Sequence, residues 1–287
     1  MLLSSNMIRL YDVFGVKGTL DLFAKTGIEG VDFNNDVAPY YTAEHDKAFY
    51  EELGDYARAH GVTICQAHAV YPPSFLGDEE KTAKRFEEIV QGMENAAALG
   101  APMIVVHPCT HLDCTVEGNF EPMYEYNLNF YRRLIPYAEK FGIKIAIENL
   151  RRAAVTNHPE ALCRLFDELN HPVFTICLDV GHCHLHNVDP ADAIRMLGDR
   201  LVNGCLHIHD NMGTADEHTL PYYGNIEWES VMKALADIDY KGNFNYEASG
   251  FIKDVPVELR PDGVAFMARV GHYLIDRFEY YKSQKKG

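Results

Sequence analysis

The sequence predicts an α/β protein in which residues 1–287 form a single (β/α)₈ barrel domain. Short runs of β-branched residues alternate about eight times with longer amphipathic stretches, a pattern typical of parallel strands joined by crossover helices. The 287 residues also match the length that one closed barrel uses. A doubly wound open sheet is the alternative, but no G-x-G-x-x-G turn follows any predicted strand.

The strands are predicted from short runs rich in Val, Ile, Phe and Thr. In chain order these runs occupy residues 1–5, 30–33, 62–65, 103–106, 143–147, 174–178, 202–208 and 244–246. The first run is the weakest of the eight.

The stretches between the strands are predicted to be helices because their apolar residues recur at spacings of three and four. They cover residues 42–60, 81–99, 128–141, 159–169, 226–237 and 261–281, and one more helix starts at Pro190. Gly100 stands where a C′ glycine ends a helix, and Asp189 precedes Pro190 as an N-cap. Pro136 is expected to kink or interrupt its helix.

The composition excludes several classes of protein. No stretch approaches the roughly 20 apolar residues that a membrane span needs, and the N-terminal residues lack the pattern of a secretory signal. The 7 cysteines are an odd number without a C-x-x-C pair, which favours free thiols in a reducing compartment. We therefore expect a cytoplasmic protein.

The charge of the chain bears on its partners. There are 26 Lys and Arg against 42 Asp and Glu, which gives a net charge of −16. Nonspecific binding to duplex DNA depends on basic side chains that neutralise phosphates. The charge therefore disfavours nucleic acid as a partner without excluding it.

Six consecutive predicted strands, from the third onward, are followed by a histidine or a carboxylate. These residues are His68, His107, Glu148, Asp179, His207 and Glu247. The carboxyl ends of barrel strands converge on the face that carries catalytic residues. Imidazole and carboxylate together bind Zn²⁺, Mn²⁺, Co²⁺ or Fe²⁺, and a carboxylate at the end of an apolar strand needs a cation or donors. A single histidine at a strand end is usually an ordinary polar residue, but the set predicts a divalent-metal site.

Further polar side chains follow in the adjacent loops. His182, three residues after the carboxylate of the sixth strand, is expected to be functional. Asp216 and His218 share a later loop and could reach the same site or simply face solvent. His184 and His186 extend a histidine tract, but a mobile loop lacks the ligand spacing of a closed zinc site.

Five motifs resemble those of the xylose isomerase-like TIM-barrel superfamily. They are Ile104-Val-Val-His107-Pro108, Ile145-Ala-Ile-Glu148-Asn149, Cys177-Leu-Asp179-Val-Gly-His182, Leu206-His207-Ile-His209-Asp210-Asn211 and Tyr246-Glu247. The superfamily holds sugar isomerases and epimerases, inosose dehydratases and abasic-site nucleases of the endonuclease IV type. The resemblance implies a TIM barrel but no single activity.

In the ketose 3-epimerase branch, one divalent metal is bound by residues that match Glu148, Asp179, His207 and Glu247, and the match to His182 contacts substrate. The resemblance thus implies Mn²⁺, Zn²⁺ or Co²⁺ as cofactor and a sugar, sugar phosphate or cyclitol as substrate. The metal would acidify a C–H bond of the open-chain sugar and stabilise an enediolate. Glu148 and Glu247 would be the catalytic residues that remove and return the proton. Relatives often form dimers or tetramers.

The nuclease branch binds three zinc ions with a larger set of ligands. Beside the four residues above, that set matches His68, His107, His182, Asp216 and His218, which are therefore predicted to bind substrate or additional metal. The chain lacks the glycine-rich opening of the nucleases, and its sixth and seventh strand ends have the isomerase form. The prediction is a metal-dependent isomerase or epimerase, with a trinuclear zinc phosphodiesterase on abasic DNA or an inosose dehydratase-like lyase as alternatives.

Overall fold

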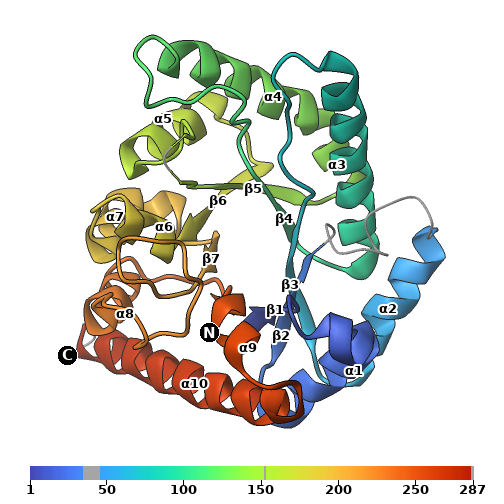
Figure 1. The fold of residues 1–287 in the computed structure, drawn as a ribbon, viewed down its shortest axis with the longest axis vertical. Helices are drawn as coiled ribbons and strands as arrows, with labels where there is room; N and C mark the ends of the chain where they lie inside the picture. The colour runs from blue at the N-terminus through green and yellow to red at the C-terminus, as the bar shows by residue number, and fades with distance from the viewer. Residues whose placement is uncertain (35–45, 152, 286–287) are drawn as a thin grey trace.

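Eight parallel strands form a nearly closed barrel surrounded by helices (Figure 1). The computed structural model describes residues 1–34, 46–151 and 153–285. The strands are β1 (Leu3–Asn6), β2 (Gly30–Asn34), β3 (Thr63–His68), β4 (Met103–Val106), β5 (Lys144–Glu148), β6 (Phe174–Asp179), β7 (Cys205–His207) and β8 (Phe244–Tyr246). Each predicted strand is present, with its ends displaced by a few residues at most. The (β/α)₈ prediction is confirmed.

The strand order is β7-β6-β5-β4-β3-β2-β1-β8, so the last strand pairs with the first. The circle is completed between β7 and β8 by a parallel bridge from Ile208 to Tyr246. The Ile208 N–H donates to the Asn245 carbonyl at 2.8 Å, and the Ile208 carbonyl accepts from the Glu247 N–H at 2.9 Å. This closure places Glu247 beside the other strand ends.

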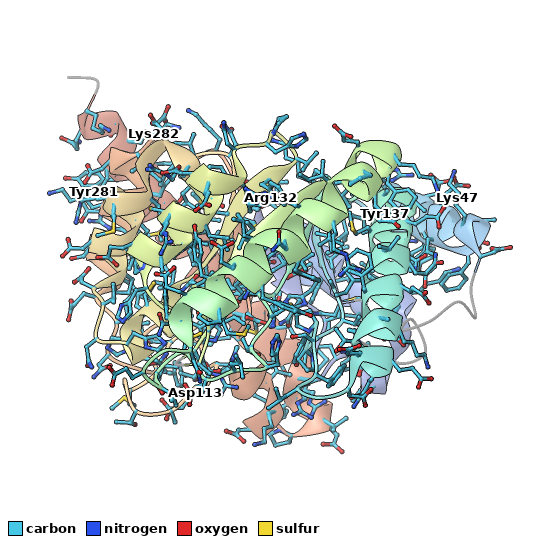
Figure 2. The ribbon with its side chains drawn as sticks, turned by 90° about the horizontal axis from the view of Figure 1, so that it is seen from above. Lys47, Asp113, Arg132, Tyr137, Tyr281 and Lys282 are labelled. Atoms are coloured by element: carbon cyan, nitrogen blue, oxygen red, sulfur yellow. The ribbon has the colours of Figure 1, made fainter. Side chains whose placement is uncertain are left out.

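The helices cover the outside of the barrel. They are α1 (Tyr11–Thr26), α2 (Lys47–Ala59), α3 (Glu79–Leu99), α4 (Phe120–Phe141), α5 (Pro159–Leu169), α6 (Val180–Leu185), α7 (Pro190–Leu197), α8 (Trp228–Asp237), α9 (Ser249–Asp254) and α10 (Arg260–Gln284). Figure 2 shows α4 running along the surface, with Arg132 and Tyr137 on it. Within the described ranges, no helix has both the length and the apolar character needed to cross a membrane.

The predicted helix signals mostly hold. Gly100 ends α3 in the left-handed conformation, with φ 91°, and the Asp189 side chain accepts the N–H groups of Ala191 and Asp192 at the start of α7. Residues 42–45 of the helix predicted over 42–60 lie outside the described residues.

Helix α4 differs from its prediction in two ways. It begins at Phe120 rather than at residue 128. The prediction missed its first turns because a buried position there holds the polar Asn127, which is hydrogen-bonded to the backbone of Cys109 and breaks the apolar spacing. It also continues through Pro136, so of the predicted kink or interruption the interruption is wrong. The carbonyl that loses its helical donor belongs to the exposed Arg132, where water can replace the missing hydrogen bond.

The tract that follows β6 is also different from its prediction. Residues 180–185 form the short helix α6 instead of a mobile loop, because the Asp179 carboxylate accepts the His182 N–H at 2.6 Å and caps the helix. His184 and His186 belong to none of the candidate ligand groups found among the described residues.

Alternate residues of a strand face the same side, so the residues two positions before the polar side chains at the strand ends form a layer inside the barrel. Those polar side chains are Asn6, Asn34, His68, His107, Glu148, Asp179, His207 and Glu247. Half of that layer is apolar and comes from β4 to β7: Val105, Ala146, Cys177 and Cys205. The other half is polar, comes from β1, β2, β3 and β8, and is fully buried: Ser4, Asp32, Gln66 and Asn245. A polar layer therefore supports one side of the strand-end face.

Candidate metal centre

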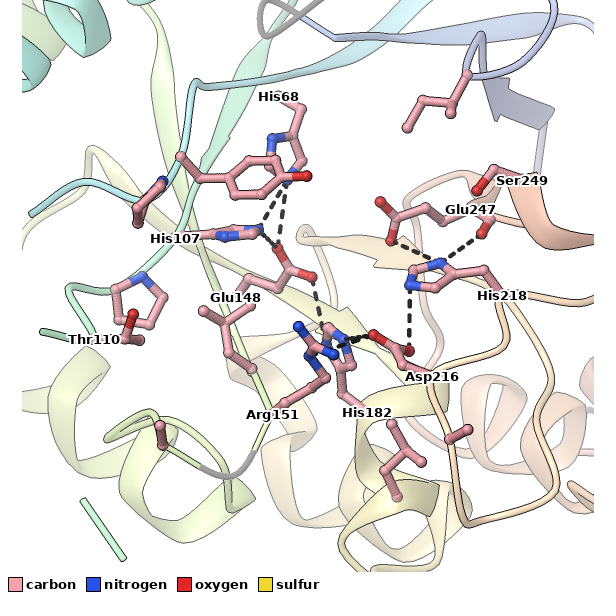
Figure 3. A pocket seen from close by; sticks show the side chains of 18 of the residues that line it. His68, His107, Thr110, Glu148, Arg151, His182, Asp216, His218, Glu247 and Ser249 are labelled. Carbon is pink, nitrogen blue, oxygen red and sulfur yellow. Dashed lines mark hydrogen bonds and ion pairs between the residues drawn. The ribbon is translucent and has the colours of Figure 1, made fainter. Parts of the chain in front are cut away.

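A cavity of about 790 Å³ opens at the carboxyl ends of the strands. Seven of the nine predicted site residues line it, and Figure 3 shows them pointing toward one another: His68, His107, Glu148, His182, Asp216, His218 and Glu247. The other two, Asp179 and His207, are fully buried and contact lining residues. The structure thus brings all nine predicted residues to one face.

Four side chains from the ends of β5 to β8 form what we call the central group: Glu148, Asp179, His207 and Glu247. Each offers a ligand atom, and these atoms all lie within 4.8 Å of one another. His207 Nδ1 is 3.0 Å from Glu148 Oε1 and 3.3 Å from Glu247 Oε2. Three carboxylates around one imidazole match the donors that divalent transition metals take.

A second set of candidate ligands shares two residues with the central group. His68, Glu148 and His207 also offer atoms within 4.8 Å of one another. His107 Nε2 lies 2.9 Å from Glu148 Oε2 and 3.1 Å from His68 Nε2. Glu148 Oε2 is nevertheless buried without a partner of hydrogen-bond geometry. A buried carboxylate oxygen without a hydrogen-bond partner is unusual unless an ion binds it.

A third set, which we call the loop group, consists of His182, His209, Asp216 and His218. Asp216 Oδ2 is 3.5 Å from His182 Nε2, and Asp216 Oδ1 is 3.2 Å from His218 Nε2. Asp216 and His218 therefore point into the site, a question that the sequence left open.

Backbone carbonyls fix the tautomers of three histidines in these sets. The Nδ1–H groups of His68, His182 and His218 donate to the carbonyls of Ala69, Asn149 and Glu247 at 2.8, 2.9 and 2.9 Å. Because a carbonyl only accepts, Nδ1 carries the proton and the neutral ring presents a lone pair at Nε2. This is the orientation that metal-ligating histidines adopt.

The charges of the site depend on one another. Burial alone would raise the pKa of Glu148, but the facing rings of His207 and His107 hold this pKa well below its usual range. Burial likewise opposes the charged form of His182, yet nearby carboxylates, Asp179 first among them, raise its pKa to about 10. Protons on histidines thus balance the carboxylates when no cation is bound.

Asp32 is a site residue that the sequence analysis missed. Its Oδ2 lies 3.4 Å from His207 Nε2 and accepts hydrogen bonds from Gln66 Nε2 at 3.0 Å and Asn245 Nδ2 at 3.1 Å. Ser4 Oγ in turn donates to Asn245 Oδ1 at 2.9 Å. This network contacts the side of the His207 ring that faces away from the central group. The sequence feature that could have identified Asp32 is a polar residue two positions before the end of β2.

His209 was missed as well. Its ring is fully buried, with Nε2 3.0 and 3.2 Å from the two Asp179 oxygens, and it stacks on His218 with the centroids 4.0 Å apart. Gly181 leaves room for this ring, because a Cβ there would overlap it. His209 therefore links the central group to the loop group.

Asp210 anchors the loop that bears Asp216 and His218. Its fully buried carboxylate accepts the backbone N–H of Tyr222 at 2.9 Å and the indole N–H of Trp228 at 2.8 Å. These bonds tie the far end of the loop to the end of β7, which holds the Asp-x-His pair over the cavity.

Comparison with known sequences agrees with this fold. Residues 20–269 match the family described as xylose isomerase-like TIM barrel. An uncharacterized protein of Sinorhizobium fredii, y4fM, is 28% identical over 264 residues, which cover 83% of this chain and 82% of that protein. The D-psicose 3-epimerase of Enterocloster bolteae is 26% identical over 67% of this chain and 63% of that enzyme. A probable endonuclease 4 of Halorhodospira halophila is 28% identical over 63% of this chain and 66% of that protein.

Solved structures share the architecture at low identity. The IolI protein with a bound zinc atom superposes with a TM-score of 0.79 at 19% identity, covering 98% of this chain and 99% of the other. A D-psicose 3-epimerase in the presence of D-fructose gives 0.75 at 16% identity, covering 96% and 99%. These likenesses establish the fold.

Proposed function

Since the chain belongs to the xylose isomerase-like TIM barrel family, we propose that it is a metal-dependent sugar isomerase or epimerase. The observation that carries the proposal is the central group, whose four ligand atoms lie within 4.8 Å of one another beside a cavity of about 790 Å³. The D-psicose 3-epimerase relative supports a small-molecule sugar as the substrate.

The residues of the central group fit a divalent ion. Three carboxylates and one imidazole gather in a buried place, which is costly without a cation. Glu148 Oε2 is buried without a partner of hydrogen-bond geometry, as expected of an oxygen that binds an ion. We propose Mn²⁺, Zn²⁺ or Co²⁺ as the ion, since all three accept mixed nitrogen and oxygen donors.

The protein's own residues divide the chemistry between them. An ion held by the central group would polarise the oxygens of an open-chain sugar and acidify the neighbouring C–H bond. Glu148, at the end of β5, and Glu247, just after β8, are the proposed proton-transfer pair: one removes the proton and the other returns it from the opposite face. His182 lines the cavity, with its Nε2 3.5 Å from Asp216 Oδ2, and is the proposed contact to the substrate.

The test is the exchange of substrate protons with solvent. Protein loaded with each of the three ions is incubated in D₂O with a panel of ketoses and aldoses, and deuterium incorporation is followed by NMR. Glu148→Gln and Glu247→Gln should each slow the exchange by about 10²- to 10⁴-fold, whereas Glu125→Gln, on the exposed face of α4, should not change it. If no sugar exchanges a proton with any ion, the proposal fails.

The second and third sets of ligands favour one other candidate, a phosphodiesterase with more than one metal ion. His68, His107, His182, Asp216 and His218 would then hold additional ions instead of substrate. Elemental analysis separates the two functions, because the hydrolase needs three ions per chain and a content of one contradicts it. An inosose dehydratase-like lyase would use the same central group and release water, which product analysis detects.

A further inference from the structure

The cavity has two chemically different sides. Among the described residues that line it, the carboxylates all lie at or after the ends of β5, β7 and β8: Glu148, Asp216 and Glu247. The lining residues after β3 and β4 include no carboxylate, lysine or arginine, and four of them form an apolar and aromatic wall: Tyr71, Pro72, Pro73 and Pro108. A substrate that reacts beside the central group therefore has this wall on its other side.

Tyr71 carries the aromatic ring of the wall, and its contacts place that ring at the cavity. The centroid of the ring lies 4.9 Å from that of His107 and 5.9 Å from that of His68. Both histidines line the cavity, as Tyr71 itself does. Tyr71 keeps 51% of its surface exposed, so the packing against the two histidines leaves much of the ring accessible to a molecule in the cavity.

The ring of Tyr71 is also close to the proposed chemistry. A single imidazole, that of His107, lies between it and Glu148, because His107 Nε2 is 2.9 Å from Glu148 Oε2. Glu148 is one of the two proposed proton-transfer residues. A sugar whose reacting carbon lies at Glu148 can therefore reach the Tyr71 ring with the rest of its chain.

The segment that bears Tyr71 is held from two directions. Arg85 on α3 donates from Nη1 to the Pro72 carbonyl at 2.8 Å. Ser74 Oγ is hydrogen-bonded to Nδ1 of His111, in the loop after β4, also at 2.8 Å. These bonds fix the backbone on the C-terminal side of Tyr71 before a ligand arrives, so that binding costs little ordering of the wall.

A tyrosine ring suits one particular part of a sugar. The hydroxyl groups of a sugar need hydrogen bonds, but its C–H bonds form an apolar side. Packing that side on an aromatic ring removes apolar surface from water, and the negative face of the ring attracts the slightly positive C–H hydrogens. The contact depends on configuration, because a hydroxyl that points into the ring loses its hydrogen bond to water.

We propose that Tyr71 is a specificity-determining residue whose ring packs against the C–H side of the sugar, at the end away from the reacting carbon. The inference rests on the proposed function for the reaction and on the geometry of the cavity wall for the contact.

The experiment compares Tyr71→Ala with Tyr71→Phe. Proton exchange in D₂O is measured with the metal-loaded protein and the ketose that the wild type exchanges fastest. Tyr71→Ala should raise KM by about tenfold and leave kcat within about twofold of the wild type, because the lost contact binds substrate and transition state alike. Tyr71→Phe retains the face of the ring and should retain the wild-type KM. Calorimetric titration with the whole panel of sugars gives Kd without turnover.

Three further measurements separate this contact from general damage to the site. The wild type should prefer one of two ketohexoses that differ only at C5, and Tyr71→Ala should reduce that preference in kcat/KM. Tyr71→Ala should hold as much metal as the wild type by elemental analysis, because its two ring contacts lie outside the central group. Tyr137→Ala, on the outside of α4 (Figure 2), is the matched control and should keep the wild-type KM.

Any of four results overturns the inference. Tyr71→Ala keeps the wild-type KM and Kd, or Tyr71→Phe loses as much affinity as Tyr71→Ala, or Tyr71→Ala loses metal, or the Tyr71-dependent ligand is a duplex with an abasic site. Proton exchange that does not depend on Tyr71 would remove this inference and leave the proposed function standing. Tyr71-dependent binding of a sugar without exchange in the presence of any ion would do the reverse. If the wild type neither binds nor exchanges any sugar, both are wrong.

Discussion

Replacing Asp32 by asparagine is expected to weaken metal binding although it leaves every proposed ligand in place. The Asp32 carboxylate lies 3.4 Å from His207 Nε2, and it is itself held by the amides of Gln66 and Asn245. An asparagine has the same shape, and it turns either its side-chain oxygen or its side-chain NH₂ group toward the amides of Gln66 and Asn245. In neither orientation does it place a negative charge beside His207 Nε2. In the wild type this charge orients the His207 ring and raises the basicity of its Nδ1.

The size of the effect follows from the contact. Loss of a partner that orients a ligating histidine typically costs 10- to 100-fold in metal affinity, which corresponds to about 1.4 to 2.7 kcal/mol. At a metal concentration 100 times the wild-type Kd, binding stabilises the native protein by about 2.7 kcal/mol. The variant should retain only about 0.4 to 1.4 kcal/mol of that stabilisation at the same concentration.

The assay compares urea unfolding with and without the metal, together with a chelator competition that gives Kd directly. The metal-free comparison separates a fold defect from a weaker site. Asp192→Asn, on the exposed face of α7, is the matched control and should keep the full metal-dependent stabilisation. A Kd for Asp32→Asn within about twofold of the wild type would refute the role assigned to the polar layer, because the proposed effect is at least tenfold.

Three other changes test the supports of the site. His207→Ala should lose the metal, measured by elemental analysis, and with it the metal-dependent rise in Tm; full metal content contradicts the assignment of the central group. Asp210→Ala should lower the free energy of unfolding in urea by about 3 kcal/mol, since buried N–H groups lose a charged acceptor, and a loss below about 1 kcal/mol contradicts its anchoring role. Gly181→Ala should lower the free energy of unfolding by about 1 to 3 kcal/mol, because its Cβ overlaps the His209 ring. The control Gly263→Ala in α10 makes only ordinary contacts and should be neutral or slightly stabilising. Equal effects of the two changes in urea unfolding would contradict the packing argument.

The fold was predictable because its signals are local. Alternation of apolar runs with amphipathic stretches identifies strands and helices from neighbouring residues, and strand ends then fall on one face for any parallel barrel. This is why Glu148, Asp179 and His207 could be placed together before the structure was known. Helices α1, α6 and α9 were not predicted, since α1 contains Gly15 in a non-helical conformation and α6 and α9 span only six residues each.

Contacts between elements that are far apart in the chain could not be predicted from the sequence. Asp32 and His207 come from β2 and β7, and no local pattern indicates that one carboxylate lies behind the other ring. The inward direction of Asp216 likewise depends on the bonds that Asp210 makes across the loop. The alternation of side-chain directions along β2 would have identified Asp32 as an interior residue. Its contact with His207, however, depends on closure of the barrel.

The closure of the barrel has a consequence for protein synthesis. The central group draws its members from the last four strands, and its final member, Glu247, follows β8, which pairs with β1 at the opposite end of the strand sequence. A growing chain therefore has an incomplete set of ligands until β8 has been made and has found β1. In the proposed metal enzyme, full-affinity metal binding would therefore follow completion of the barrel, and the ion would stabilise the contact between the first and last strands that the ribosome produces.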